Sequence, residues 1–273
     1  MTEPRPKTLA EHGDFLREMV KLQLWFIWRW RRLHPEEPFQ TVIRTRVDIF
    51  RKTALNKGPS KNTATAGDFT LPEWLALEAR AEQLCAAAAT AEAFENLAWE
   101  ELFRSVVEAR VERDFAEGDG LDNYQCGSLR YSVPKPGKTR VSFHIGNRIS
   151  PRSIFADPAY LPGCFFELME AVERLGATEL CTGTWLNSFH KWLALFPPEW
   201  QARLTPCAQE VGWSQGHWGQ FVNARGTFNA RHGALMRQTG RLPFPNQASW
   251  CEIPRLRAHL YDFLKRGPVV RDS

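Results

Sequence analysis

The amino-acid sequence predicts an α+β or α/β fold, in which a helical N-terminal layer is followed by a C-terminal unit with a small sheet flanked by helices. Two observations predict it. Apolar residues recur at helical spacing through most of the first 120 residues, whereas two segments after residue 120 alternate apolar and polar side chains. Gly118 and Gly120 mark the change. The composition, 43% hydrophobic and 24% charged, is that of a globular chain and excludes disordered or collagen-like classes.

Helices account for most of the expected N-terminal region. One of them is signalled by Thr70, which supplies an N-cap oxygen, by Pro72 in the first turn, and by Glu73, which completes a capping box. The residues before Thr70 are mostly Gly, Ser, Thr and Ala and predict a loop. The expected helices cover residues 9–33, 42–55, 70–88 and 91–116.

The C-terminal region mixes strands with helices. Residues 125–133 and 139–146 predict a hairpin, because turn residues separate two alternating segments. We expect residues 1–120 and 121–273 to be two domains, or two parts of one merged domain. The remaining elements are a helix over 160–175, a strand over 178–184, and helices over 186–195, 199–204, 217–239 and 254–265, of which the helix over 217–239 is either continuous or interrupted at Gly226.

Charge is unevenly distributed along the chain, although the net charge is only +4. Basic residues outnumber acidic ones over 28–61 and acidic residues dominate over 68–122, so helices of these segments are expected to pack against each other. The net bias is too small to indicate a nucleic-acid partner by itself. Residues 211–251 contain four arginines and no carboxylate, which makes them the best anion-binding candidate.

Cysteine usage and hydropathy predict a cytoplasmic protein. Six cysteines occur singly without CxxC spacing, and no signal peptide is recognisable, so reduced thiols are expected. The most apolar run, residues 22–30, is too short to cross a bilayer. Its tryptophans and arginines fit a core helix, which is favoured, or an amphipathic helix on a membrane surface. The oligomeric state does not follow from the sequence.

The first candidate site lies at the end of the strand expected over 139–146. Val141 and Phe143 share one face of this strand, so His144 points to the other. An imidazole there can act as a general base, while Arg148 or Arg152 in the following turn can clamp a carboxylate or phosphate. The alternative is a structural His144 beside solvated arginines.

The second candidate site lies where the strand over 178–184 runs into a helix. Small residues at the strand end let a ligand approach the backbone, and helix N-terminal amides favour anions. Asn187 and His190 share a helical face and can converge on one ligand beside Trp185. Alternatively, Asn187 caps the helix and His190 is only exposed. A nucleophilic Cys181 is disfavoured, because a lone buried cysteine is usually a packed small residue.

The third candidate site is the acid-free segment, where aromatic side chains alternate with amides and guanidinium groups. Aromatic rings can supply a stacking wall, and the polar groups can orient an anionic or planar ligand. The alternative is a helix whose aromatic stripe is core and whose arginines pair with the acidic N-terminal helices. The candidate residues are His217, Trp218, Gln220, Arg225, Asn229 and Arg231.

No cofactor is favoured. Four histidines, at 144, 190, 217 and 232, could gather around a transition metal, but HxH and HxxxH spacings are absent and nearby carboxylates are few. Haem in an aromatic pocket with arginines on its propionates would equally explain the many Trp, Phe and Arg residues. P-loop, GxGxxG and GxSxG motifs are missing, so nucleoside-triphosphate, Rossmann-type and α/β-hydrolase functions are poorly supported.

The leading hypothesis is an enzyme of small-molecule, including secondary, metabolism that acts on a carboxylate- or phosphate-bearing substrate by proton or group transfer. His144 would transfer the proton, Asn187 would stabilise developing negative charge, and Arg152, Arg225 and Arg231 would hold the anion. Group transfer is preferred to redox chemistry. The two alternatives are a haem- or metal-dependent oxidoreductase and a non-catalytic protein that binds anions or nucleic acid.

Overall fold

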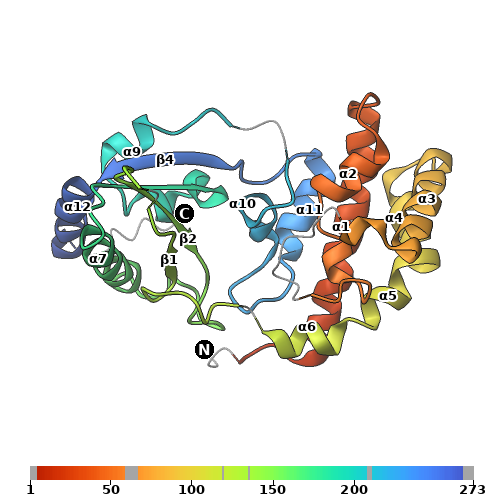
Figure 1. Cartoon of the computed structure of the whole chain (residues 1–273), viewed down its shortest axis with the longest axis horizontal. Helices are drawn as coiled ribbons and strands as arrows, with labels where there is room; N and C mark the ends of the chain where they lie inside the picture. The colour runs from red at the N-terminus through yellow and green to blue at the C-terminus, as the bar shows by residue number, and fades with distance from the viewer. Residues whose placement is uncertain (1–4, 59–66, 119, 135, 208–210, 267–273) are drawn as a thin grey trace. The chain divides into compact units, whose positions relative to one another are not determined.

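The computed structural model describes residues 5–58, 67–118, 120–134, 136–207 and 211–266. These residues form helices and one four-stranded mixed sheet, which confirms the α+β fold (Figure 1). The chain divides into two compact units. The helical unit comprises residues 7–120 and 210–243, and the sheet unit comprises residues 1–6, 121–209 and 244–273. The chain changes from the helical unit to the sheet unit after residue 120, and residues 210–243 belong with the N-terminal helices. That the units are separate domains stays a prediction.

The helical unit is organised around α1, Leu9–Leu33. Thr8 and Glu11 form a capping box at its start, and one face of the helix is buried in the core of this unit. The other elements are α2 (Phe39–Thr45), η1 (Phe50–Lys52), η2 (Asp68–Thr70), α3 (Pro72–Ala87), α4 (Ala91–Ala98), η3 (Trp99–Phe103), α5 (Arg104–Glu108), α6 (Val111–Glu117), α10 (Gln215–Trp218), η5 (Gly219–Phe221) and α11 (Ala230–Thr239).

The predicted helix over 42–55 is wrong, because the helix ends at Thr45 and a short 3-10 turn follows. Between them Asp48 is buried and accepts hydrogen bonds from Gln23 Nε2 and Lys52 Nζ, each at 2.5 Å. Burial acts to raise the pKa of Asp48, but the positive charge of Lys52 and the hydrogen bonds from Lys52 and Gln23 together outweigh it and hold the pKa below its ordinary value. A local turn that satisfies a buried carboxylate thus interrupts the helical pattern.

Two other N-terminal predictions need correction. Thr70 is not an N-cap: its hydroxyl donates to the Gly67 carbonyl within η2, and α3 begins with Pro72 after an uncapped Leu71. The single helix over 91–116 is three α-helical pieces, because η3 is a π-helical turn and the chain breaks again before Val111.

Several arginines of the basic segment 28–61 make ion pairs or ring contacts inside the helical unit. Arg44 forms a two-pronged ion pair with Glu78 (Nε–Oε2 2.8 Å and Nη2–Oε1 2.7 Å), which is the expected pairing of basic and acidic helices. Other arginines lie over tryptophan rings, and these stacks account for part of the Trp and Arg enrichment. The pairs, with the distance from the guanidinium carbon to the ring centroid, are Arg29 on Trp25 (5.3 Å), Arg32 on Trp28 (4.8 Å), Arg46 on Trp30 (5.0 Å) and Arg51 on Trp213 (4.7 Å).

The sheet unit contains β1 (Leu129–Tyr131), β2 (Arg140–Ile145), β3 (Glu179–Thr184) and β4 (Gln247–Glu252), in that spatial order. The pairs β1–β2 and β3–β4 are antiparallel and β2–β3 is parallel. The expected hairpin and third strand are confirmed, but β4 was not predicted. The helical elements are α7 (Tyr160–Glu173), η4 (Trp185–Ser188), α8 (His190–Leu193), α9 (Pro198–Ala202) and α12 (Ile253–Arg266).

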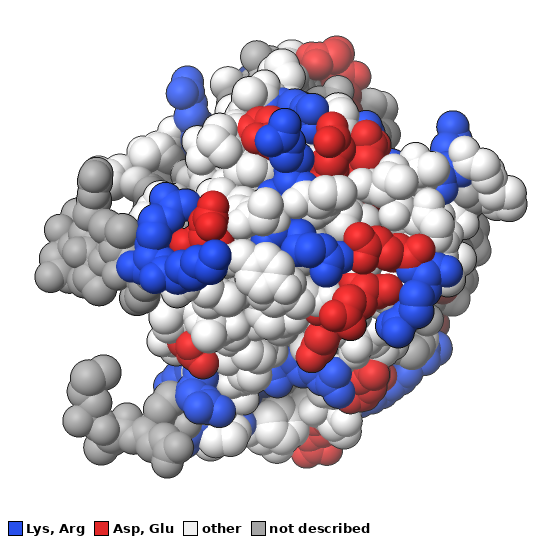
Figure 2. Space-filling model, turned by 90° about the vertical axis from the view of Figure 1, so that its left-hand side faces the viewer, with Lys and Arg blue, Asp and Glu red and all other residues white. Residues whose placement is uncertain are grey.

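Helices α7 and α12 lie together beside the sheet (Figure 1). Strand residues such as Phe143 and Leu180 are fully buried, and the Phe143 ring packs edge-on against Phe165 of α7. Figure 2 views the side of the sheet unit on which α7 and α12 lie, and Lys and Arg are interspersed there with Asp and Glu. Arg257 of α12 forms an ion pair with Glu173 of α7. Although α1 is 25 residues long, neither it nor another helix of the described residues is apolar enough to cross a bilayer.

Candidate functional site on the open face of the sheet

The side of the sheet away from its buried residues carries a histidine, two arginines, a cysteine and a tryptophan. Burial alternates along β2, so Val141 and Phe143 are buried while Ser142 and His144 are exposed, as the sequence predicted. We call this side the open face. Its residues, fixed by this alternation and by the strand registers, are Arg130, Arg140, Ser142, His144, Glu179, Cys181, Gly183, Ala248, Trp250 and Glu252.

Trp250 is held between two arginines on the open face. The guanidinium carbons of Arg140 and Arg203 lie 3.9 and 3.7 Å from its ring centroid. Arg140 also donates to Glu179 at 2.8 Å, across the β2–β3 pair. The arrangement places an Arg–Trp–Arg stack on the face, in which Arg140 is paired with Glu179 and Arg203 lies 4.0 Å from Glu252. It was not predicted from the sequence, because the stack requires the cross-strand register and a residue from outside the sheet.

Cys181 lies next to Trp250 in the register and opposite Ser142. Burial raises the pKa of its thiol above the ordinary value, although Arg140 acts in the opposite direction. A thiol with a raised pKa is a poor nucleophile at neutral pH, because the thiolate is the reactive form. The structure therefore favours the interpretation of Cys181 as a packed residue.

His144 lies directly opposite Arg130 in the β1–β2 register. Although the residue is exposed on one side, burial of the rest of the imidazole lowers its pKa below the ordinary 6.5, and the positive charge of Arg130 lowers it further. The imidazole is therefore neutral at pH 7. A neutral imidazole beside a guanidinium group can accept a proton next to a bound anion.

The two strand-end segments singled out in the sequence lie at one edge of the sheet. Because β2 and β3 are parallel neighbours, their carboxyl ends meet at the same edge, which we call the carboxyl edge. Residues 140–142 of β2 pair with residues 179–181 of β3, so His144 and Gly183 each lie two residues beyond the last pair of these strands. β4 runs the opposite way and begins at this edge, where Gln247 pairs with Thr184.

The segments that reach the carboxyl edge lack acidic residues. Residues 139–156, 180–198 and 244–251 contain no Asp or Glu. Arg148, after β2, is exposed and uses one Nη1–H to bond the Tyr124 carbonyl at 2.9 Å. Arg152 is exposed in the same loop, whose Asn147 Nδ2 donates to the Arg152 carbonyl at 2.8 Å. The edge is therefore electrostatically suited to an anion.

Asn187 occupies a structural position at this edge. Its Nδ2 donates to the carbonyls of Thr182 and Gln247 at 3.2 and 2.8 Å, and its Oδ1 accepts from the indole nitrogens of Trp192 and Trp200 at 3.0 and 3.1 Å. The amide is buried, with 1% of the residue exposed. Both of its donors and both acceptor positions are used, so this arrangement favours a packing role over the stabilisation of charge on a substrate.

Four half-buried aromatic residues contact one another at the carboxyl edge. The ring centroids of Trp185 and Phe244 are 5.7 Å apart, Phe189 lies 5.9 Å from Phe244, and Phe155 lies 5.4 Å from Phe189. Of these, only Trp185 was a candidate from the sequence. The phenylalanines lie on three separate segments, so no local pattern could have grouped them. His190 begins α8, is exposed, and contacts the Phe189 ring at 5.1 Å.

The third predicted site belongs to the helical unit, which differs from the expectation that it shares a unit with His144. Trp218 and Phe221 are buried in the helical core. His217 Nδ1 lies 3.1 Å from the Ser214 hydroxyl, and Gln220 donates to the His217 carbonyl at 2.7 Å. The helical region predicted over 217–239 is interrupted around Gly226, the alternative that the sequence left open: α10, η5 and α11 are helical, and residues 222 and 228 between them are joined by a β-bridge.

The polar residues of this segment have varied partners. Asn229 caps α11 by accepting from the His232 backbone N–H. Arg225 Nη2 lies 2.9 Å from Glu11 Oε1, and Arg237 Nη2 lies 2.8 Å from Glu95 Oε1. Arg231 is exposed on α11. Two of the four arginines thus pair with acidic residues of the N-terminal helices, as the alternative interpretation of this segment expected.

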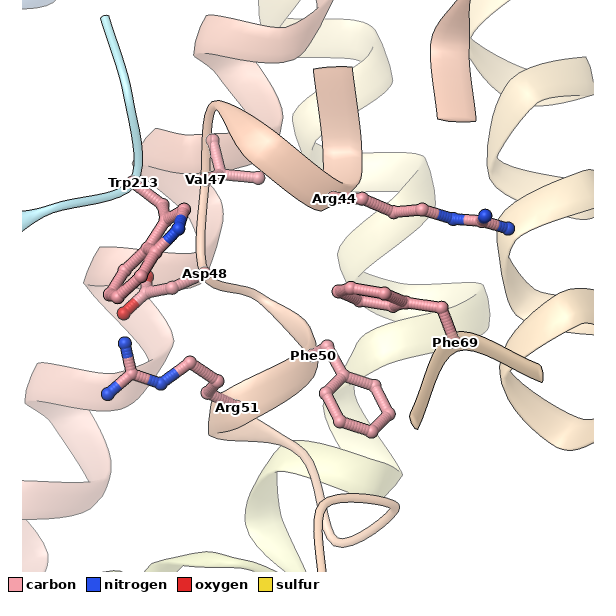
Figure 3. A pocket seen from close by; sticks show the side chains of 7 residues that line it. All are labelled: Arg44, Val47, Asp48, Phe50, Arg51, Phe69 and Trp213. Carbon is pink, nitrogen blue, oxygen red and sulfur yellow. The ribbon is translucent and has the colours of Figure 1, made fainter. Parts of the chain in front are cut away.

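The helical unit also contains a small hollow (Figure 3). Trp213, Asp48 and Arg51 lie on one side of it and Phe50 and Phe69 on the other, while the Arg44 guanidinium points away from it. The hollow has room for little more than a water molecule, so it does not resemble a substrate pocket. Asp48, which lines the hollow, belongs to the turn in which Gln23 and Lys52 bond its carboxylate, and this structural role is the best explanation of its presence here. The lining residues are Arg44, Val47, Asp48, Phe50, Arg51, Phe69 and Trp213.

Within the described part of the chain, no three His, Cys, Asp or Glu side chains come together in a way that could hold a metal ion. Comparison of the chain with protein-family models, with curated proteins and with solved structures gives no match. A function for this chain therefore has to be inferred from the side chains of the open face.

Proposed function

We propose that this protein is an enzyme of small-molecule metabolism that acts on an anionic substrate, with His144 as the group that transfers a proton. The observation that carries the proposal is the position of His144, neutral and solvent-accessible, opposite Arg130 and at an edge whose three segments lack acidic residues. A carboxylate or phosphate is the chemical group that such a surface attracts.

The roles follow from the contacts. Neutral His144 accepts a proton from the substrate, and the resulting imidazolium is stabilised by the negative charge of the same substrate. Arg130 lies where it can bind the anionic group next to the imidazole. Arg148 and Arg152 add positive charge from the loop after β2, and Arg148 is fixed by its bond to Tyr124. Asn187, Arg225 and Arg231 are left out of this site, the first because its hydrogen-bonding groups are used and the others because they belong to the helical unit.

An NMR titration of the histidine rings tests the proposal without a known substrate. Inorganic phosphate and acetate are added separately, and the pKa of each histidine is measured. An anion bound beside His144 favours the imidazolium, so the pKa of His144 should rise with anion concentration. His259 of α12, whose Nε2 lies 3.0 Å from the Ala194 carbonyl, is the internal control in the same unit. If His144 and His259 respond equally, or neither responds, the proposed site is wrong.

A further inference from the structure

Two small residues form an exposed floor on the open face. Gly183 and Ala248 are paired directly across β3 and β4, and both are exposed. The nearest atoms to a Cβ placed on Gly183 would be Ala248 Cβ at 3.8 Å and Asn246 Oδ1 at 3.9 Å. The space above the floor is therefore not filled by neighbouring side chains of the described residues.

Aromatic residues flank this floor along the strand direction. Trp250 is two residues after Ala248 on β4 and therefore on the same face, and it is half-buried between Arg140 and Arg203. At the opposite end, Trp185 directly follows β3 and lies 5.7 Å from Phe244. Arg140 and Arg203 cover the faces of the Trp250 ring, but their own side chains are 43% and 31% exposed, so a planar ligand can stack on the outer surface of a guanidinium group. Trp185 is half-buried against the core of the sheet unit.

Polar atoms near the floor have unused hydrogen-bonding capacity. Asn246 Oδ1 is buried and accepts no hydrogen bond in the described part of the chain, and Arg203 Nη1 is buried without an acceptor among the same residues. Leaving such atoms without partners costs free energy. A ligand over Gly183 that carries a hydrogen-bond donor would supply the partner that Asn246 Oδ1 lacks, whereas Arg203 Nη1 belongs to the guanidinium group stacked on Trp250.

We propose that the surface over Gly183 and Ala248 binds the flat ring of an aromatic carboxylate, which is the substrate class of the site. This inference rests on the proposed function, because the carboxylate is to be held beside His144. A planar ring can lie over a floor without side chains and stack on a planar guanidinium group beside Trp250, whereas a puckered aliphatic ring of the same size stacks less well. Arg140 and Arg203 beside Trp250 already have Glu179 and Glu252 as partners, at 2.8 and 4.0 Å, so the carboxylate of the ligand is assigned to Arg130 and His144.

The test compares three probes: naphthoate, its saturated counterpart decahydronaphthoate, and acetate. Their dissociation constants are measured from the backbone amide shift of Gly183, and the ring shift of His144 is followed in the same samples. Naphthoate should bind about tenfold more tightly than decahydronaphthoate, which has the same number of carbons, because ring stacking is worth about one power of ten in affinity. Acetate should bind most weakly.

Substitution of the floor gives the second arm. Gly183→Val fills the space with a side chain that suits a strand, and should weaken naphthoate binding about tenfold while changing acetate binding less than about twofold. Ala248→Val is a second variant with the same expected effect. The matched control is Gly163→Val on α7, where a Cβ meets no atom within 4 Å. That change should leave all three affinities unaltered.

The outcomes separate the two proposals. If the three carboxylates all shift His144 but bind equally, or if both floor variants bind naphthoate normally, the aromatic site is refuted and the anion site stands. If naphthoate perturbs Gly183 but no carboxylate shifts His144, the aromatic surface is supported and the proton-transfer role of His144 is refuted. If none of the probes binds, both proposals fail.

Discussion

Arg130 and His144 face each other across the β1–β2 ladder on the open face of the sheet. Because the positive charge of Arg130 is one of the two causes that lower the pKa of His144, Arg130→Gln should raise that pKa. Arg140→Gln is the matched control, since Arg140 is on the same face but is paired with Glu179. The measurement is the pH titration of the His144 ring by NMR, and an unchanged pKa in Arg130→Gln would show that burial alone controls it.

The lowered pKa of His144 also predicts how stability depends on pH. In the unfolded chain the imidazole binds a proton near its ordinary pKa of 6.5, whereas the folded protein binds it only at lower pH. The unfolded state therefore binds more protons in this window, and the contribution of His144 to stability is lost as the pH falls below about 6.5. Urea midpoints measured between about pH 7.5 and pH 5.5 should fall less in His144→Gln than in the wild type. Parallel curves for the two proteins would contradict this.

Two arginines of the acid-free segment should differ in what they contribute. Arg225 pairs with Glu11 in a half-buried contact, so Arg225→Ala should lower the free energy of unfolding by up to about 1 kcal/mol. Arg231 is exposed on α11, so Arg231→Ala should change it by less than about 0.5 kcal/mol. Urea unfolding of the two variants provides the comparison. A larger loss for Arg231→Ala than for Arg225→Ala would mean that the pairing around α11 has been assigned incorrectly.

The sequence predicted the class of fold and the strand elements near the site, because these depend on local periodicity. The alternation of Val141 and Phe143 with Ser142 and His144 is visible in the chain, and it correctly placed His144 on the exposed side of β2. The proximity of the strand ends after β2 and β3 could not be predicted. It depends on the parallel pairing of the two strands, which is not encoded in either segment alone.

The core that the acid-free segment, residues 211–251, would join could not be predicted from the sequence either. Trp218 and Phe221 are apolar residues at helical spacing, and such residues can pack into any nearby core. The sequence carried no signal for which core they would join, so residues next to β4 along the chain were expected beside the sheet. Similarly, the stack of Arg140 and Arg203 on Trp250 joins residues from distant segments and follows only from the register.

Asn187 provides the sharpest test of a structural role at the carboxyl edge. Asn187→Ala removes four hydrogen bonds at once and leaves the indole N–H groups of Trp192 and Trp200 buried without their acceptor. Each unsatisfied buried group costs about 1–3 kcal/mol, so the variant should lose about 3–5 kcal/mol of unfolding free energy. The control is Gln201→Ala on α9, an exposed position where the change should be less than about 0.5 kcal/mol. If Asn187→Ala is as stable as the control and instead loses anion binding at His144, the amide serves the ligand, and the hydrogen bonds to the two indoles contribute little to the fold.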